Sequence, residues 1–351
     1  MLSFKPDKSL KAPILRCCPA AIRMNAMELR VVFMGSPDFA LPTLRNLGAH
    51  YPVIGVITQP DRPSGRGQQL SPPPIKSLAL ELGIEVFQPE RLRRPESFAI
   101  LQAWAPDLIV VTAYGQILRQ NVLDLARYGC INVHASLLPR WRGAAPIQAA
   151  ILHGDNVSGA TIMKMDAGID TGGVLARREV EIFADDTTAS LSPRLAEAGA
   201  QLLIDTLPGY LAGGIHPTEQ DDAQSSYAPM IKKEEGLLDF TQTVLALVNR
   251  VRAFQPWPGT HLLWQDLPLK VIRAHARFDQ DAQFRLASEE LPSQIPSNSA
   301  PNQPCTRTIL EKLPAVRAAD GWLVLDQVQP AGKKPMTGRD FLAGARAWSN
   351  S

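Results

Sequence analysis

Three polar side chains in this sequence have the chemistry needed for acyl transfer. Asn132 and His134 are two residues apart, so on an extended segment both point to the same face. An amide donor can hold a developing oxyanion, and an imidazole can exchange a proton near neutral pH. Asp170, within Gly168–Gly172 (GIDTG), could orient the imidazole and favour its protonated form. Together they suit acyl transfer through a tetrahedral intermediate.

The spacing alone leaves a structural interpretation of the same residues open. A histidine at a strand end is more often structural than catalytic, Asn132 could cap a turn, and Asp170 precedes Thr-Gly, which is typical of turns. On spacing alone these structural interpretations are favoured. The decision therefore depends on the elements around the three residues.

The elements expected around these residues form an open α/β sheet. From Glu28 onward, short apolar runs alternate with segments of helical spacing, which predicts an open, mostly parallel Rossmann-like sheet. Ligands of such sheets bind outside the carboxyl ends of the strands, where Asn132 to Gly143 would lie. The main expected strands are 29–34, 53–58, 85–87, 108–112, 130–133, 161–165 and 174–180, and the main expected helices are 39–47, 75–82, 98–104, 122–127 and 188–207.

The chain divides into four segments by composition. Residues 1–26 are a basic tail, either disordered or the result of a start codon assigned too early; a transit peptide is the alternative. Residues 27–211 form the α/β domain, and 212–233, rich in Gly, Pro, Gln, Asp and Ser, form a linker. Residues 234–351 contain a helix at 244–254 and short strands, typical of a small OB-like β-barrel, with a Pro-rich disordered insertion near 288–304.

Composition excludes several classes of protein. The 351 residues carry a net charge of +2 and four cysteines without metal-ligand spacing, so neither a disulfide framework nor a metal site is expected. No apolar run reaches about 18 residues, so we expect no membrane span. The cytoplasm is the expected location, or an organellar matrix if the tail is a transit peptide, and we expect a monomer.

The wider sequence resembles the folate-dependent formyltransferase family, in particular its methionyl-tRNA members. The signature of the family, N-x-H before S-L-L-P and a later D-x-G-x-D-T-G, is present at 132–139 and 166–172. The segments that extend the resemblance are MGSPDFA (34–40), TQPDRPSGRG (58–67), VVTAYGQIL (110–118), INVHASLLPRWRGAAPIQ (131–148) and QPAGKKPM (329–336).

This resemblance implies a function and a set of site residues. It places Asn132, His134 and Asp170 in the catalytic positions, and the Ser136–Pro139 loop (Ser136, Leu137, Leu138, Pro139) against 10-formyltetrahydrofolate, the formyl donor. Two exposed leucines there would give the pteridine an apolar wall. The amine of methionyl initiator tRNA would attack the formyl carbon directly, without a metal or a covalent enzyme intermediate.

The acceptor tRNA would be held by basic residues of both domains. The loop 59–69 carries Arg62 and Arg66, and Arg66 takes the place of a functional arginine, although Gln68 and Gln69 follow where family members often continue with lysines. Residues 234–351 hold 13 Lys+Arg against 12 Asp+Glu, so a basic face must come from arrangement. The candidates are Lys270, Lys333 and Lys334, with Arg250, Arg252 and Arg273.

Other functions are less consistent with the sequence. A glycinamide ribonucleotide formyltransferase would usually end near the first domain, whereas a sugar-nucleotide formyltransferase shares much of it. A nicotinamide oxidoreductase expects G-x-G-x-x-G after the first strand, where this chain has GSPDFA (35–40). A non-catalytic RNA-binding protein of the same fold would not need Asn132, His134 and Asp170 together.

Overall fold

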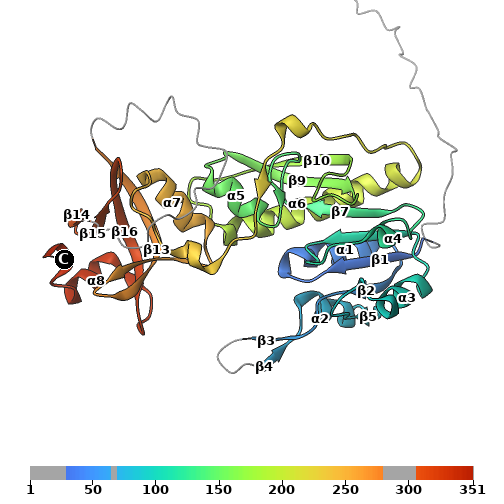
Figure 1. Cartoon of the computed structure of the whole chain (residues 1–351), viewed down its shortest axis with the longest axis horizontal. Coiled ribbons are helices and arrows are strands. Elements are labelled where there is room, and N and C mark those ends of the chain that lie inside the picture. The colour runs from blue at the N-terminus through green and yellow to red at the C-terminus, as the bar shows by residue number, and fades with distance from the viewer. Residues whose placement is uncertain (1–28, 65–68, 280–305, 351) are drawn as a thin grey trace, which may run out of the picture.

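The computed structural model describes residues 29–64, 69–279 and 306–350 as two packed units joined by a long connection (Figure 1). The predictions for the tail at 1–26, for Arg66 and for the insertion at 288–304 lie outside these described residues. Each unit has its own hydrophobic core. In the described residues, no helix combines the length and apolar character needed to cross a bilayer.

The first unit is built on a seven-stranded sheet in the order β10-β9-β7-β6-β1-β2-β5. Five adjacent strands, β7 to β5 in that order, run parallel, and β9 turns antiparallel to both of its neighbours. This confirms the predicted mostly parallel α/β sheet. The strands are β1 (Val31–Gly35), β2 (Val53–Ile57), β5 (Val86–Phe87), β6 (Leu108–Thr112), β7 (Cys130–His134), β9 (Val157–Lys164) and β10 (Val174–Glu181).

Helices cover both faces of this sheet, so alternate residues of a central strand enter different cores. In β1, Val31 and Phe33 share a core with one set of helices, while Val32 and Met34 share a core with the other. All five residues of β1 are buried, which explains its continuous apolar sequence. The first set is α1 (Leu41–His50), α2 (Pro74–Glu81) and α6 (Thr188–Leu211), and the second is α3 (Pro95–Ala103) and α4 (Gln120–Leu123).

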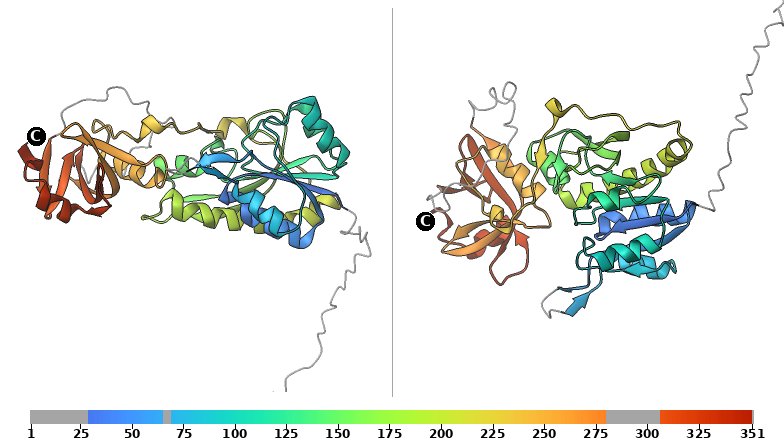
Figure 2. Two further views of the ribbon diagram at one scale, coloured as in Figure 1. Left: turned by 90° about the horizontal axis from the view of Figure 1, so that it is seen from below. Right: turned by 45° about the vertical axis from the view of Figure 1, so that its right-hand side comes forward.

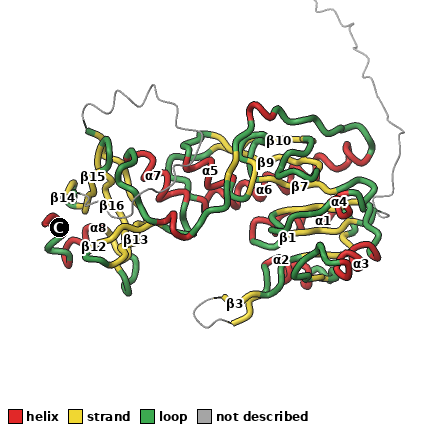
Figure 3. Tube along the Cα trace, in the orientation of Figure 1, coloured by secondary structure: helices red, strands yellow, loops and turns green. Residues whose placement is uncertain are grey.

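Two features lie outside the main sheet but bear on function. A hairpin of β3 (Arg62–Ser64) and β4 (Gln69–Ser71) projects from the first unit (Figures 1 and 3). The short strand β8 (Arg142–Gly143) follows the Ser136–Pro139 loop and leads into α5 (Pro146–Leu152). The connection from α6 pairs with β8 through β11 (Tyr227–Ala228), after η2 (Asp222–Gln224), so this segment runs along the first unit before it reaches the second.

The second unit, orange to red in Figure 2, is built on an antiparallel sheet. The strand order is β12-β13-β16-β15-β14, with β17 paired to β16. The Arg307 guanidinium donates to the Leu263 carbonyl at 2.8 Å, which links β14 to β12 and brings the two edges of the sheet together. The elements are η3 (Lys233–Gly236), α7 (Val244–Ala253), β12 (Thr260–Trp264), β13 (Leu267–Phe278), β14 (Arg307–Leu310), β15 (Leu313–Arg317), β16 (Gly321–Pro330), β17 (Met336–Thr337), α8 (Gly338–Gly344) and η4 (Trp348–Asn350).

The two units meet where α5 and α7 share a core that includes Phe254. Arg250 is 3% exposed and donates to the Glu235 carbonyl at 3.1 Å, while Arg252 donates to the Asp186 carbonyl at 2.9 Å. Burial lowers the pKa of both guanidinium groups. The prediction that Arg250 belongs to an RNA-binding face is therefore wrong, because its side chain is buried. Arg252 is half-buried, with its guanidinium bonded to main-chain carbonyls.

A buried carboxylate stabilises the start of α6 beside this junction. Asp186 is 4% exposed and accepts hydrogen bonds from Ser190, from the Phe183 amide and from the Arg194 guanidinium. Burial alone would raise the pKa of Asp186, but these hydrogen bonds lower it below the ordinary value of 3.8. Asp186 thus supports folding as a carboxylate.

Candidate active site

Strand β7 presents Asn132 and His134 on one face of the sheet. Ile131 and Val133 pack into the core on the α6 side, whereas Cys130 packs into the opposite core. Because side chains alternate along a strand, Asn132 and His134 point to the same face as Cys130, and they are 9% and 6% exposed. The two side chains therefore lie together at the carboxyl end of a central strand, as their spacing predicts.

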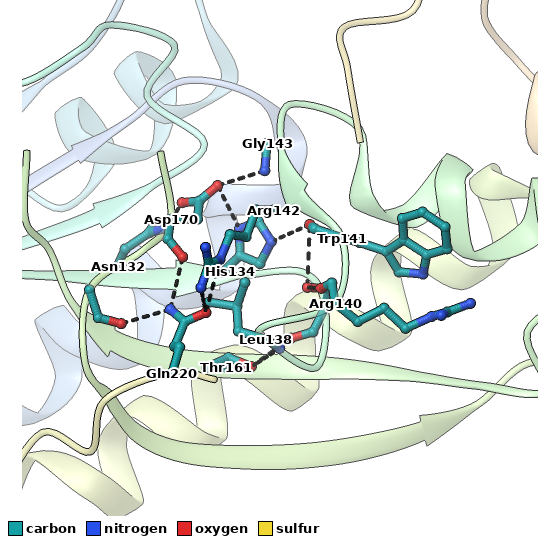
Figure 4. A network of polar contacts seen from close by, with 12 residues as sticks. Asn132, His134, Leu138, Arg140, Trp141, Arg142, Gly143, Thr161, Asp170 and Gln220 are labelled. Carbon is teal, nitrogen blue, oxygen red and sulfur yellow. Dashed lines mark hydrogen bonds and ion pairs between the residues drawn. The ribbon is translucent and has the colours of Figure 1, made fainter. Parts of the chain in front are cut away.

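Asp170 approaches this pair from the loop between β9 and β10 (Figure 4). Its Oδ1 accepts from Asn132 Nδ2 at 3.4 Å, and its Oδ2 lies 3.6 Å from His134 Nδ1 and accepts from the Gly143 amide at 2.9 Å. Its backbone φ is +52°, an uncommon left-handed conformation for an aspartate. The three residues proposed from the sequence, although 38 positions apart at the extremes, meet in one cluster.

The backbone carbonyl of Trp141 provides the closest contact to His134. It lies 2.9 Å from Nε2, so that nitrogen carries a hydrogen and donates it. The other ring nitrogen, Nδ1, faces the Asp170 carboxylate at 3.6 Å. The ring is thus oriented mainly by a main-chain group, with the longer Asp170 contact supplying charge on the other side.

Asp155 fixes Trp141 through its side chain. Trp141 Nε1 donates to Asp155 Oδ2 at 2.7 Å, and Arg140 Nη2 donates to Asp155 Oδ1 at 2.6 Å. The Arg140 guanidinium lies 4.5 Å from the centre of the indole ring, and the Trp141 amide donates to Ser226 Oγ at 2.9 Å. These supports cannot be predicted from the sequence, because no spacing pattern pairs positions 14 or 85 residues apart.

A glycine is required where Asp170 meets β8. Gly143 has a φ of +111°, and a Cβ at this position would lie 2.7 Å from the Ala228 carbonyl oxygen and 2.7 Å from the ring of Tyr227. A larger residue would push β8 away from β11 and move the amide that Asp170 accepts from. The Arg-Gly of the sequence motif therefore has a steric basis.

The Ser136–Pro139 loop buries two of its four side chains, Ser136 and Leu138. Thr161 Oγ1 donates to the Ser136 carbonyl at 2.6 Å and accepts from the Leu138 amide at 3.1 Å. Leu138 is 1% exposed and packs with Met163 and Val174, so the expectation of two exposed leucines is wrong for this residue. Only Leu137 and Pro139 are partly exposed, which leaves them and the backbone available to a ligand.

The predicted tRNA-binding residues fall into two separate places. Arg62 lies at the base of the β3–β4 hairpin, where it donates to Gln59 Oε1 at 3.3 Å. Lys270, Lys333 and Lys334 line one groove of about 540 Å³ with Gln329 and neighbouring residues of the second unit, called here the lysine groove. The structure thus brings the three lysines together without bringing them to Arg62.

Neither thiol nor metal chemistry is favoured by the described side chains. Burial raises the pKa of Cys130 to about 12, so its thiol stays protonated although it is two residues from Asn132. Among the residues that the structure describes, no cluster of three or more His, Cys, Asp or Glu could hold a metal ion. The polar groups suited to chemistry here are the amide, imidazole and carboxylate already described.

Comparison with known proteins first defines the class. The family model "Formyl transferase" matches residues 29–207, and "Formyl transferase, C-terminal domain" matches 230–346. Two solved structures share the fold at low identity: an N-formyltransferase from Helicobacter canadensis (TM-score 0.57, 17% identity, 86% of this chain and 99% of that one) and HypX from Aquifex aeolicus (0.54, 16%, 91% and 47%). The chain therefore belongs to the formyl transferase class and shares its fold.

Curated relatives then define the particular family. A protein of Citrifermentans bemidjiense named methionyl-tRNA formyltransferase is 46% identical over 90% of this chain and 93% of its own length. One of Thermosynechococcus vestitus with the same name is 45% identical over 91% and 96%. The chain belongs to the methionyl-tRNA formyltransferase family, which confirms the resemblance seen in the sequence motifs.

Proposed function

We propose that this protein transfers the formyl group of 10-formyltetrahydrofolate to the α-amine of methionyl initiator tRNA, giving N-formylmethionyl-tRNA and tetrahydrofolate. The observation that carries the mechanism is the convergence of Asn132 Nδ2 and His134 Nδ1 on the Asp170 carboxylate, 3.4 Å and 3.6 Å away. Acyl transfer needs donors where negative charge develops and a group that can carry a proton, and both are present.

The reaction follows from these groups in a single transfer. The free amine attacks the formyl carbon, and the carbonyl oxygen becomes an oxyanion beside Asn132 and protonated His134. Asn132 has two amide hydrogens, so one can remain on Asp170 while the other meets the oxyanion. A proton leaves the amine and reaches N10 of the folate, with His134 or an ordered water as its carrier. The C–N10 bond then breaks.

The folate is assigned to the sheet edge beside this cluster. Supporting this assignment, the Ser136–Pro139 loop follows β7 directly, and the partly exposed Leu137 and Pro139 offer apolar contact for a pteridine. Ile117 in the loop after β6 and Ile169 beside Asp170 are 85% and 55% exposed. Exposed aliphatic side chains on the loops that follow central strands are suited to a flat apolar ring.

The tRNA is assigned to both units. The lysine groove can neutralise phosphates, and Arg62, on the β3–β4 hairpin of the first unit, is assigned to the acceptor end together with Arg66, which lies outside the described residues. We place the enzyme in the cytoplasm as a monomer, with each chain carrying its own Asn132, His134 and Asp170. The free, buried thiol of Cys130 is consistent with a reducing compartment.

One assay tests the proposal against its closest alternative. Purified protein is mixed with 10-formyltetrahydrofolate labelled in the formyl group and with methionyl initiator tRNA, methionyl elongator tRNA or a sugar-amine nucleotide. We expect rapid labelling of the initiator tRNA alone, and its loss in His134→Ala under single-turnover conditions. Preferential labelling of the sugar would replace this function with that of a sugar N-formyltransferase. Unchanged transfer in His134→Ala would contradict the mechanism.

A further inference from the structure

The connection between the two units places one glutamine inside the catalytic cluster. Gln220 lies between the end of α6 and β11, and its side chain is directed between the Asp170 loop and β8 (Figure 4). The sequence segment 212–233 was predicted as a linker only, and no role was assigned to any of its side chains. Its contacts show that the segment also takes part in the catalytic unit.

The Gln220 amide uses all of its hydrogen-bonding capacity. Its Oε1 accepts from Arg142 Nε at 3.1 Å and from Arg142 Nη2 at 3.0 Å. Its Nε2 donates to the Asp170 carbonyl at 2.8 Å and to the Gly172 carbonyl at 2.7 Å. Two acceptor lone pairs and two N–H groups are thereby satisfied, which is the full complement of a side-chain amide.

These four bonds join the two segments that set the position of the Asp170 carboxylate. One segment is the loop that carries Asp170 itself, and the other is β8, whose Gly143 amide donates to that carboxylate. The remaining partner of Arg142 is Asp222, which is 83% exposed at its side chain and so contributes little to rigidity. Arg142 is 10% exposed at its side chain, so Gln220 is its main interior partner.

We propose that Gln220 is a positioning residue for formyl transfer: it ties β8 to the Asp170–Gly172 loop and so keeps the Asp170 carboxylate beside Asn132 and His134. The inference rests on the proposed function, because its kinetic test measures formyl transfer. The connection at 212–233 would then have two roles: it joins the first unit to the unit that carries the lysine groove, and it holds the Asp170–Gly172 loop in position.

The test compares substitutions at two glutamines of the same connection. Gln220→Ala removes all four bonds, and Gln220→Glu keeps the acceptors for Arg142 while removing both donors. Gln224→Ala is the matched control, because Gln224 Nε2 bonds only within the connection, to Asp221 Oδ2 at 2.8 Å. We expect kcat to fall at least tenfold in both Gln220 variants with KM for folate and tRNA within twofold, and both constants to stay within twofold in Gln224→Ala.

A measurement without substrate separates this inference from the proposed function. Hydrogen exchange followed by mass spectrometry on peptides spanning residues 166–175 should be faster in both Gln220 variants than in the wild type or Gln224→Ala. Unchanged exchange, kcat within twofold of the control, or a rise in KM at unchanged kcat would each overturn the inference. If Gln220→Ala fails to fold, Gln220→Glu decides, because it keeps the Arg142 contact. Wild-type protein that formylates nothing contradicts the proposed function alone.

Discussion

Asp170→Asn replaces the one carboxylate that contacts both Asn132 and His134. In the wild type its oxygens accept from Asn132 Nδ2 and from the Gly143 amide and face His134 Nδ1. The asparagine keeps the shape but exchanges one acceptor for an NH₂ group, so at least one of these donors would face another donor. The negative charge that faces His134 Nδ1 also disappears.

The expected magnitude lies between two limits. A buried donor left without an acceptor costs about 2 kcal/mol, which sets the lower limit. The attraction between an imidazolium and a carboxylate 3.6 Å apart is about 4–5 kcal/mol at an effective dielectric constant of about 20. This energy is an upper limit, because it leaves out the cost of desolvating the two charges. At about 1.4 kcal/mol per factor of ten, the rate of transfer should fall between about 30-fold and about 2,000-fold.

The assay is single-turnover formyl transfer to methionyl initiator tRNA at saturating 10-formyltetrahydrofolate, which isolates the chemical step. Asp205→Asn is the control, because Asp205 of α6 forms an exposed ion pair with Arg178 of β10 and contacts none of the three site residues in the described structure. It should change the rate by less than twofold. A rate for Asp170→Asn within threefold of this control, at an unchanged melting temperature, would refute the electrostatic role given to Asp170.

Three further outcomes are expected. Asn132→Ala should lower the single-turnover rate by about 10²–10³-fold, the usual cost of losing one oxyanion donor, with tRNA binding unchanged by filter assay. Replacing all three lysines of the lysine groove by alanine should raise KM for tRNA roughly tenfold and leave kcat within twofold when tRNA saturates. KM for tRNA should also depend less steeply on salt concentration, and an unchanged dependence would argue against phosphate contact. Asp186→Asn should lower the free energy of unfolding by about 1–3 kcal/mol at pH 7. Because the folded pKa of Asp186 lies below 3.8, the wild-type advantage should be full above about pH 5 and disappear as the pH falls through the folded pKa, which urea titrations at several pH values can measure.

The parts of the fold governed by simple periodicity could be predicted from sequence. Strand β6 is a nearly continuous apolar run because helices cover both faces of the sheet, and in β7 the two-residue spacing of Asn132 and His134 places both on one face. Strand β15 was missed because the β14–β15 turn uses Glu311 and Lys312 at positive φ. Two-residue turns of this kind normally contain Asn or Gly, so the residues at this turn do not predict a hairpin.

The supports of the site were harder to predict than its reactive groups. The Asp155–Trp141 contact and the Gln220 bridge depend on how distant loops cross one another, which local pattern does not encode. Leu138 is expected from the sequence to be exposed as part of an apolar wall for the pteridine, yet the Thr161 hydroxyl holds the loop against β9 and the Leu138 side chain is buried. Tertiary hydrogen bonds, rather than propensity, decide these positions.

The carbonyl that orients His134 belongs to the backbone of Trp141, not to any side chain. No substitution at position 141 other than one that alters the path of the chain can delete this acceptor, and a search for interacting side-chain types would pass over it. Alanine scanning would therefore attribute its effect to residues that shape the path, such as Asp155 and Ser226. The orientation of His134 thus depends on a main-chain conformation, which side chains of different types at position 141 could support.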